Sequence, residues 1–119
     1  MVDDCIFCKI IAGDIPSSKV YEDEEVLAFL DISQVTPGHT LVVPKKHARN
    51  LLEMDETATA QLFARVSKVA KKVETATQAK GMNIISNMEE VSGQTVFHTH
   101  VHIIPRYSDQ DELAISFTE

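Results

Sequence analysis

The sequence of 119 residues has no tryptophan, two cysteines, four glycines and four prolines. Cys5 and Cys8 stand too close together, and are too few, to form the disulfide framework of a small secreted protein. The low proline and glycine content, with 44% hydrophobic and 24% charged residues, excludes a collagenous or intrinsically disordered chain. We therefore expect a single globular domain over residues 1–119.

Positive charge and long apolar runs are also scarce. The sequence has eleven Lys and Arg residues and eighteen Asp and Glu residues, which gives a formal net charge of −7. We expect no nucleic-acid partner, because such binding draws on many basic side chains. No apolar run approaches the roughly 18–20 residues that span a bilayer, so no membrane partner is expected. Asp3 and Asp4 stand where a secretory signal would carry Lys or Arg, which favours a cytoplasmic location. Residues 107–119 are expected to form an acidic C-terminal tail.

The predicted elements indicate an α+β domain with a five-stranded antiparallel sheet. Short β-branched runs between turn residues predict strands at 19–22, 25–31, 39–44, 82–87 and 96–106. One long helix is expected over 55–80, between the third and fourth strands, where it can cover the sheet.

The long helix is predicted from one apolar stripe, formed by Leu62, Val66, Val69, Val73 and Ala76. Asp55 can cap its start, and Lys80-Gly81 suits its end. A short N-terminal helix is expected over 3–12, with Asp3 or Asp4 as its cap.

Three of the five histidines alternate in the segment VFHTHVHII. Alternate side chains of a strand share a face, so His98, His100 and His102 are predicted to project together. A neutral imidazole can attack phosphorus, and neighbouring imidazoles can stabilise charge on phosphoryl oxygens. The same three side chains would also suit a transition metal. The segment therefore predicts either phosphate chemistry or a metal site.

Other polar residues allow two or more interpretations. The pair Cys5 and Cys8 is typical of a metal site, a redox pair or a chance occurrence. Lys45, Lys46 and Arg49 form a basic cluster that either faces a phosphate or lies in solvent. Arg106 shares the predicted face of the histidines, where it either reaches a leaving group or forms a salt bridge. His39 is expected to be structural.

Taken together, these segments resemble the histidine triad (HIT) hydrolases and nucleotidyl transferases. The matching pieces are CIFCKIIAGDIPSSKVYEDE, LAFLDISQVTPGHTLVVPKKH, the long helix and GQTVFHTHVHIIPR. The chain is most similar to the bacterial Hit and Hint-type branch, although its ending IIPRY is similar to the Fhit branch. The resemblance implies a HIT-like sheet and a homodimer in which two sheets join.

The resemblance also implies a reaction. A purine nucleoside phosphoramidate or an adenylated compound would be cleaved at its α-phosphate through a nucleotidyl-histidine intermediate. His100 would be the nucleophile, and His102 would contact the phosphate and hold His100 in the right tautomer. Gln94 and Thr95 would contact phosphate or leaving group, with Gln94 counted among the catalytic residues.

For nucleotide binding, the resemblance implies that Asn87 is a phosphate-side amide and that Asp31 accepts the ribose hydroxyls. The slot for the base would be lined by Ile6, Phe7, Ile10, Phe29, Ile32 and Leu41. Judged by residue type alone, these six side chains would be more typical of an ordinary core.

A structural zinc ion is the implied cofactor, held by Cys5, Cys8, His47 and His98, because a closed Cys₂His₂ set is typical of structural zinc. In the competing interpretation His98 transfers protons and the cysteines are free thiols. The alternatives for function are a dinucleoside polyphosphate hydrolase of the same mechanism and a zinc-containing nucleotide-binding module with little turnover.

Overall fold

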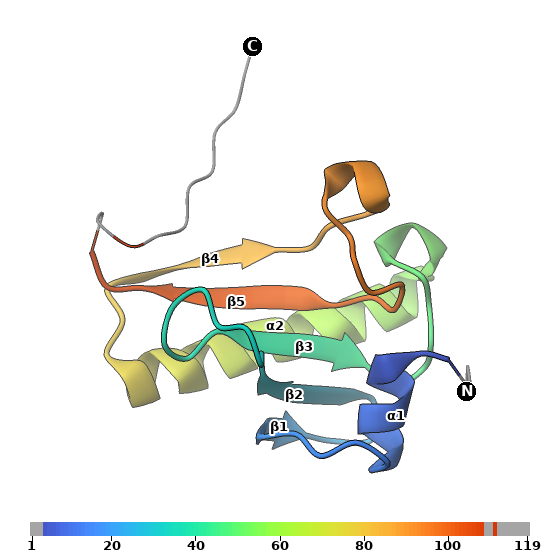
Figure 1. Cartoon of the computed structure of the whole chain (residues 1–119), viewed down its shortest axis with the longest axis horizontal. Helices are drawn as coiled ribbons and strands as arrows, with labels where there is room; N and C mark the ends of the chain where they lie inside the picture. Colours follow the sequence, from blue (N-terminus) through green and yellow to red (C-terminus); the bar gives the residue numbers. More distant parts are fainter. Residues whose placement is uncertain (1–3, 109–110, 112–119) are drawn as a thin grey trace.

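A computed structural model describes residues 4–108 and 111 of the chain. Two α-helices and five strands make up most of this part. One short 3₁₀ helix lies directly before the long second α-helix, and another lies between the last two strands (Figure 1). In chain order the elements are α1 (Ile6–Ala12), β1 (Lys19–Glu22), β2 (Val26–Leu30), β3 (Thr40–Pro44), η1 (Leu51–Glu53), α2 (Glu56–Thr77), β4 (Gly81–Ile85), η2 (Glu90–Ser92) and β5 (Val101–Arg106).

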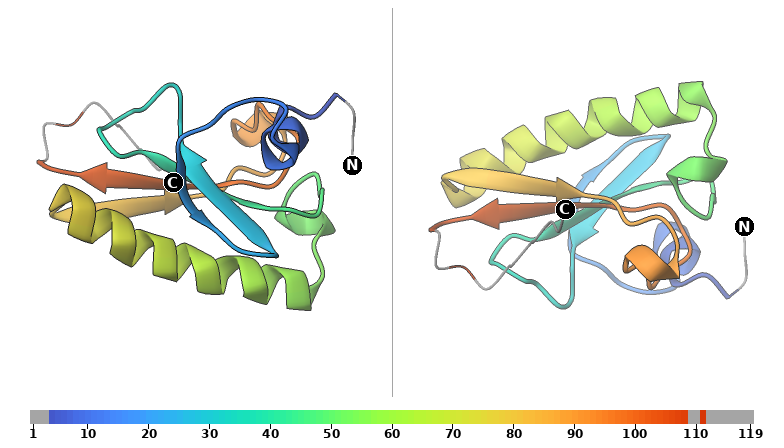
Figure 2. Two further views of the ribbon diagram at one scale, coloured as in Figure 1. Left: turned by 90° about the horizontal axis from the view of Figure 1, so that it is seen from below. Right: turned by 90° about the horizontal axis from the view of Figure 1, so that it is seen from above.

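The strands form one antiparallel sheet in the order β1-β2-β3-β5-β4, which confirms the predicted fold class. Helix α2 lies across one face of this sheet and α1 lies against the other (Figure 2). Strands β1 and β4 are its two edges.

The alternation of side chains along the strands divides the core into two apolar clusters. Towards α2, the strands present Val26, Ala28, Val42, Val101 and Ile103, which pack with four buried residues of the helix. Towards α1, they present Leu27, Phe29, Leu41 and Val43, which pack with the buried side chains of that helix. Because both faces are covered, β2 and β3 are apolar along almost their whole length.

Helix α2 confirms the predicted stripe and start, but not the predicted end. Leu62, Val66, Val69 and Val73 are buried, and the Asp55 carboxylate accepts a hydrogen bond from the Ala58 amide at 2.8 Å. The expectation for Ala76 was wrong, since it is exposed. The helix ends at Thr77, because Gln78 turns into the left-handed conformation with φ 61°.

Helix α1 begins later than predicted, and its cap is Cys5 rather than an aspartate. The Cys5 sulfur accepts a hydrogen bond from the Cys8 amide at 3.3 Å. Asp4 lies in a turn before the helix, and Asp3 is outside the described residues.

The fifth strand is shorter than predicted. It begins at Val101, so His98 and His100 precede it and only His102 belongs to the sheet. Residues 96–98 bend, since the Thr99 amide and hydroxyl bond the Ala48 carbonyl at 2.8 and 3.1 Å instead of a neighbouring strand. The fourth strand likewise ends at Ile85 instead of residue 87.

Neither helix found in residues 4–108 and 111 combines the length and the apolar character that crossing a membrane requires. Of the expected C-terminal tail, the structure describes Tyr107, Ser108 and Asp111, and the rest lies outside the described residues.

Candidate active site and metal-ligand cluster

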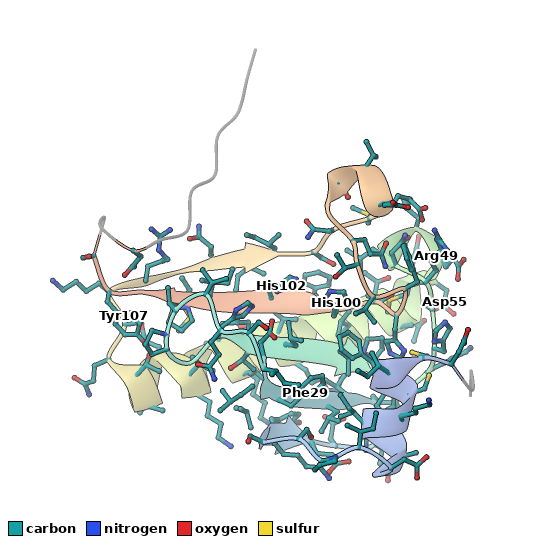
Figure 3. The ribbon with its side chains drawn as sticks, in the orientation of Figure 1. Phe29, Arg49, Asp55, His100, His102 and Tyr107 are labelled. Carbon is teal, nitrogen blue, oxygen red and sulfur yellow. The ribbon has the colours of Figure 1, made fainter. Side chains whose placement is uncertain are left out.

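Strand β5 and the segment before it place the histidines at the α1 face of the sheet. His102 pairs with Leu41 of β3, whose side chain belongs to the cluster under α1. The rings of His100 and His102 have centroids 5.0 Å apart, and Phe7 of α1 meets the His100 ring edge-on at 5.1 Å. Figure 3 shows His100 and His102 next to each other, with Arg49 beyond His100. His98 lies further towards the start of α1, where it enters a separate cluster.

That cluster contains Cys5, Cys8, His47 and His98, whose ligand atoms all lie within 4.8 Å of one another. The Cys5 sulfur is 3.4 Å from Nδ1 of His98, and the Cys8 sulfur is 3.4 Å from Nδ1 of His47. A tetrahedral zinc site with ordinary Zn–N and Zn–S bonds has donor atoms about 3.4–3.8 Å apart. The spacing of these four side chains therefore fits a metal ion of that kind.

The protonation state of His98 also fits. Its Nε2 lies 2.8 Å from the Pro44 carbonyl, which can only accept, so Nε2 carries the proton and Nδ1 presents a lone pair to the sulfurs. Burial lowers the pKa of His98 to about 4, with further lowering by His47 and His100. A histidine held neutral with its second nitrogen hydrogen-bonded to a carbonyl is the usual state of a metal ligand.

His100 is held in the opposite tautomer. Its Nδ1 donates to the His98 carbonyl at 2.8 Å, so the free lone pair is on Nε2. Burial lowers the pKa of His100, since its side chain is almost wholly enclosed. A neutral imidazole with one fixed and one free nitrogen is suited to act as a nucleophile.

His39 sets the tautomer of His102. Nδ1 of His39 accepts from the Val35 amide at 3.2 Å, so its proton is on Nε2, which donates to Nδ1 of His102 at 2.9 Å. His102 in turn carries its proton on Nε2. The nearest carboxylate oxygen of Asp31 is 3.6 Å from Nε2 of His39. His102 stays neutral, because burial first, and then His100 and His39, lower its pKa to about 4.

Asp31, His39 and His102 also lie close enough together to be considered as metal ligands. The hydrogen bonds do not fit such a site. A metal on Nε2 of neutral His39 would require a proton on Nδ1, and that nitrogen already accepts the Val35 amide proton. His39 and His102 are instead joined by a hydrogen bond, and the Asp31 carboxylate lies 3.6 Å from the same His39 nitrogen.

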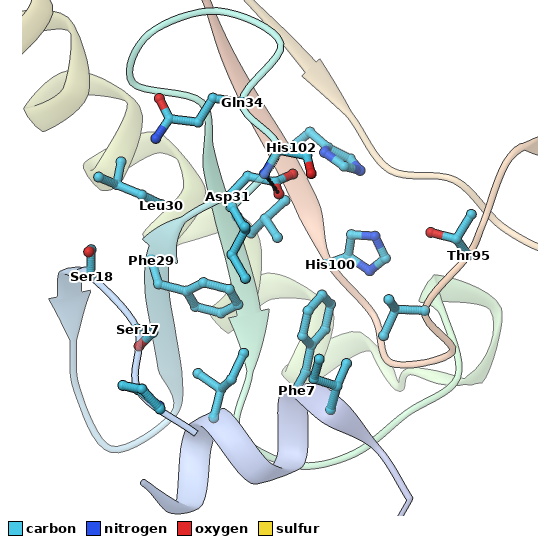
Figure 4. Close-up of a pocket in the computed structure, with 17 residues that line it drawn as sticks. Phe7, Ser17, Ser18, Phe29, Leu30, Asp31, Gln34, Thr95, His100 and His102 are labelled. Atoms are coloured by element: carbon cyan, nitrogen blue, oxygen red, sulfur yellow. Dashed lines mark hydrogen bonds between the residues drawn. The ribbon is translucent and has the colours of Figure 1, made fainter. Parts of the chain in front are cut away.

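A cavity of about 710 Å³ opens between α1, β2, β3 and the histidines. All six apolar residues predicted for the base slot line it, namely Ile6, Phe7, Ile10, Phe29, Ile32 and Leu41. Phe7 and Phe29 meet edge-on with centroids 5.6 Å apart. Asp31, Thr95, His100 and His102 line the same cavity, and Figure 4 shows them around its polar side. The cavity thus joins an apolar slot to two imidazoles.

Gln94 does not line this cavity, in contrast to its expected catalytic contact. Its side chain is buried at 2% exposure. Its amide nitrogen donates to the carbonyls of Arg49 and Val96, and its amide oxygen accepts from Asn50 and from the Glu89 amide. These four bonds use the whole hydrogen-bonding capacity of the side chain.

Asn87 is likewise not among the residues that line the cavity. It is half-buried beside Gly93, where a side chain at position 93 would meet its amide nitrogen at 3.4 Å.

Lys45 and Arg49 of the predicted basic cluster, and Arg106, are paired with acids. Lys45 contacts Glu22 at 2.8 Å, and Arg49 contacts Glu89 at 2.8 Å. Arg106 pairs with Asp111 at 3.0 Å and donates to Asn83, so of its two predicted roles the structure shows the salt bridge.

His39 is the residue of this site that sequence reasoning missed. The sequence predicted only a structural role for His39. Its contact with His102 depends on the register that sets β3 beside β5. The only available signal was an imidazole directly before a strand that neighbours the histidine-rich one.

Comparison with known proteins gives consistent matches. The family model described as HIT domain matches residues 12–109. "Protein hit" of Bacillus subtilis is 57% identical over 109 residues, covering 92% of this chain and 75% of that protein. The crystal structure of SMU.412c from Streptococcus mutans superimposes with a TM-score of 0.96 at 63% identity, covering 100% of this chain and 75% of the other. "Adenosine 5'-monophosphoramidase hnt1" of Schizosaccharomyces pombe is 39% identical over 113 residues, covering 95% of this chain and 82% of that protein.

Proposed function

The chain belongs to the HIT domain family and is a homologue of its hydrolases, and from that premise we propose that it hydrolyses purine nucleoside phosphoramidates or related adenylated compounds at the α-phosphate. One observation carries the proposal. The apolar side chains of the slot and His100, whose Nε2 is free, line the same cavity. The relative named adenosine 5'-monophosphoramidase supports the choice of substrate.

In the proposed reaction Nε2 of His100 attacks the α-phosphorus. A phosphorus–nitrogen bond to the imidazole forms as the bond to the substrate amine breaks, and the amine leaves with a proton taken from solvent. Water then attacks the same phosphorus and gives up a proton to solvent, the bond to His100 breaks, and nucleoside monophosphate is released. The Nε2 proton of His102 is the donor that the structure offers to a phosphoryl oxygen.

The rest of the cavity would bind the nucleoside. The base would lie between Phe7, Phe29 and the aliphatic side chains of the slot. A carboxylate can accept two hydrogen bonds, which suits Asp31 to a ribose diol. Thr95, at the end of the cavity near His100, would contact the phosphate or the leaving group.

We further propose that Cys5, Cys8, His47 and His98 hold a structural zinc ion. When bound, the ion would join the start of α1 to the segment that carries His100. It would stabilise the structure and take no part in the reaction. The fit rests on the four donor atoms and on the Nδ1 lone pair of His98.

A dinucleoside polyphosphate hydrolase of the same mechanism is the second candidate. It is favoured by the Ile-Pro-Arg ending of the segment, although Arg106 is engaged by Asp111 and Asn83. We also propose a homodimer located in the cytoplasm, with no nucleic-acid or membrane partner.

The deciding experiment is release of AMP from adenosine 5′-phosphoramidate by the wild-type protein and by His100→Ala. We expect rapid release by the wild type and a loss of several orders of magnitude in a folded variant, because the nucleophile has no substitute. Release from a diadenosine polyphosphate alone would favour the second candidate. Turnover of neither substrate would leave a nucleotide-binding module.

A further inference from the structure

Glu89 has an unusual backbone conformation, with φ 77° and ψ 158°. Within the described part of the chain, Gln78 is the other non-glycine residue with positive φ, and its ψ of 28° places it in the ordinary left-handed region of a helix cap. The combination at Glu89 is one that essentially only glycine adopts without strain, and it persists only where surrounding contacts enforce it.

The contacts of Glu89 are numerous enough to enforce this strained backbone conformation. Its carboxylate accepts from Nε and Nη2 of Arg49 at 2.8 and 2.9 Å, and from Nδ2 of Asn50 at 2.7 Å. Its amide donates to the Gln94 side-chain oxygen at 2.8 Å, and its carbonyl accepts from the Gln94 amide at 3.2 Å and the Ser92 hydroxyl at 2.9 Å. We call Arg49, Asn50, Glu89 and Gln94 the Glu89 clamp.

The Glu89 clamp joins two loops that are far apart in the sequence, one after β3 and one after β4. Its two amide side chains are buried, Asn50 at 1% and Gln94 at 2% exposure. Nδ2 of Asn50 bonds both Glu89 and Gln94, so each member contacts at least two others. The pKa of Glu89 is lowered by Arg49 and then by Asn50, so the carboxylate is charged at neutral pH.

The loop that the Glu89 clamp holds leads directly into the active-site cavity. Thr95 and Val96 follow Gln94 and line the cavity with His100. The Gln94 side chain also donates to the Val96 carbonyl at 3.1 Å. In Figure 4 the Thr95 hydroxyl points towards the His100 ring. The path of the chain at Thr95 is therefore determined by its neighbour Gln94, which the clamp immobilises.

We propose that Glu89 is a positioning residue for the reaction, which acts through Gln94 to keep the Thr95 hydroxyl beside His100 during turnover. This inference rests on the proposed function. It assigns a role to a strained, half-exposed carboxylate that does not line the cavity. It also explains why Gln94 is turned away from the cavity, since its side chain supports the loop instead of touching substrate.

The inference predicts a loss in kcat with little change in KM. The apolar slot for the nucleoside is formed mainly by α1, β2 and β3, and none of the hydrogen bonds described for the clamp reaches these three elements. Misplacement of a group at the reacting atoms by about 1 Å can cost roughly 100-fold in rate. We expect Glu89→Ala to lower kcat for adenosine 5′-phosphoramidate by about 10- to 100-fold, with KM changed by less than about threefold. Glu90→Ala removes the same charge one residue later and is the matched control.

Glu89→Gly separates positioning from stability. Glycine relieves the backbone strain that alanine retains, so Glu89→Gly should melt at a higher temperature than Glu89→Ala. Both variants lose the carboxylate and should lose kcat to a similar extent. Glu89→Gln keeps one oxygen that can accept from Asn50 or Arg49, and should recover most of the rate. If kcat follows the melting temperature across these variants, Glu89 is a merely structural residue and the inference is overturned.

A double-mutant cycle with Thr95→Ala tests the route of the effect. If Glu89 acts through Thr95, adding Glu89→Ala to the Thr95→Ala variant should lower kcat by less than a further factor of about three. Full additivity, or an unchanged kcat in Glu89→Ala, would overturn the inference while wild-type turnover and its loss in His100→Ala still support the proposed function. A wild type without turnover would overturn both.

Discussion

At the scale of single residues, backbone carbonyls decide which nitrogen of His98 and of His100 is free. His98 and His100 are two positions apart, yet Nε2 of the first donates a hydrogen bond to the Pro44 carbonyl and Nδ1 of the second donates one to the His98 carbonyl. His98 therefore turns a lone pair towards the cysteines, and His100 turns one towards the cavity. Neighbouring residues of one type thus have different chemistry.

His39 is the residue whose role depends most on a single hydrogen bond. His39→Leu removes the donor to Nδ1 of His102, so His102 can lose its fixed tautomer, and we expect kcat to fall by about tenfold or more. His39→Gln retains an N–H donor near the same position and should keep more activity. The check is AMP release by both variants, with the unfolding midpoint measured alongside. Equal losses in the two variants would contradict the proposed role of this bond.

His102 makes folding stability depend on pH. Its pKa is about 4 in the folded protein and near 6.5 when unfolded. Between these values the unfolded chain binds more protons, so stability falls as pH decreases from about 6.5 towards 4. In His102→Gln this contribution is absent, and the melting temperature should decline less steeply over that range. Parallel declines in wild type and variant would contradict a neutral, buried His102.

At the scale of elements, the four-residue ligand cluster connects parts of the chain that the sheet does not join. Cys5 caps α1 and Cys8 lies within it, His47 follows β3, and His98 precedes β5. The segment 96–100 leaves the sheet to reach them, which is why β5 begins only at Val101. The cluster therefore stands where strand pairing ends.

Loss of the zinc ligands should be measurable as lost stability. We expect Cys5→Ser combined with Cys8→Ser to remove bound zinc and lower the melting temperature by about 10 °C, or about 3 kcal/mol for a domain of this size. Metal analysis and thermal unfolding are the measurements. A chelator should reproduce the shift in the wild type and have no effect on the double variant. Less than about 0.2 zinc per chain in carefully handled wild-type protein would refute the site.

At the scale of the whole molecule, the described residues 4–108 and 111 cover the sheet on both faces but add no further strand at either edge. Strand β4 is one edge, and Ile84 on it is 45% exposed. An uncovered edge strand offers unpaired backbone groups to a second chain. In the proposed homodimer, we expect a second copy to extend the sheet at this edge.

The proposed homodimer predicts a mass of about 26 kDa in solution, twice the 13.2 kDa of the chain. Ile84→Lys places a charge on the open edge and should shift the protein towards the monomer. Leu52→Lys, at an exposed apolar residue on η1, is the control and should leave the mass unchanged. Size-exclusion chromatography with light scattering reads both. A wild-type mass of 13 kDa would exclude the dimer.

Local patterns in the sequence were sufficient for the fold class and the long helix, whereas the residues that gather around the cavity were predicted through the resemblance to the HIT family. Apolar spacing identifies the buried stripe of α2, because a helix repeats every 3.6 residues whatever it packs against. The order of elements, with one helix between the third and fourth strands, indicates the antiparallel sheet. The histidine-rich segment by itself indicated phosphate chemistry or a metal site, whereas the grouping of Cys5 and Cys8 with His47 and His98 was predicted through the resemblance.

Only the tertiary structure decided where the side chains of the loops point. Gln94 turns inward because Asn50 and Glu89, from distant segments, satisfy its amide. His39 gains its role from the register of β3 beside β5. The first half of the predicted fifth strand is bent because Thr99 bonds Ala48. Each of these depends on a contact between residues far apart in the sequence, and local spacing carries no record of such contacts.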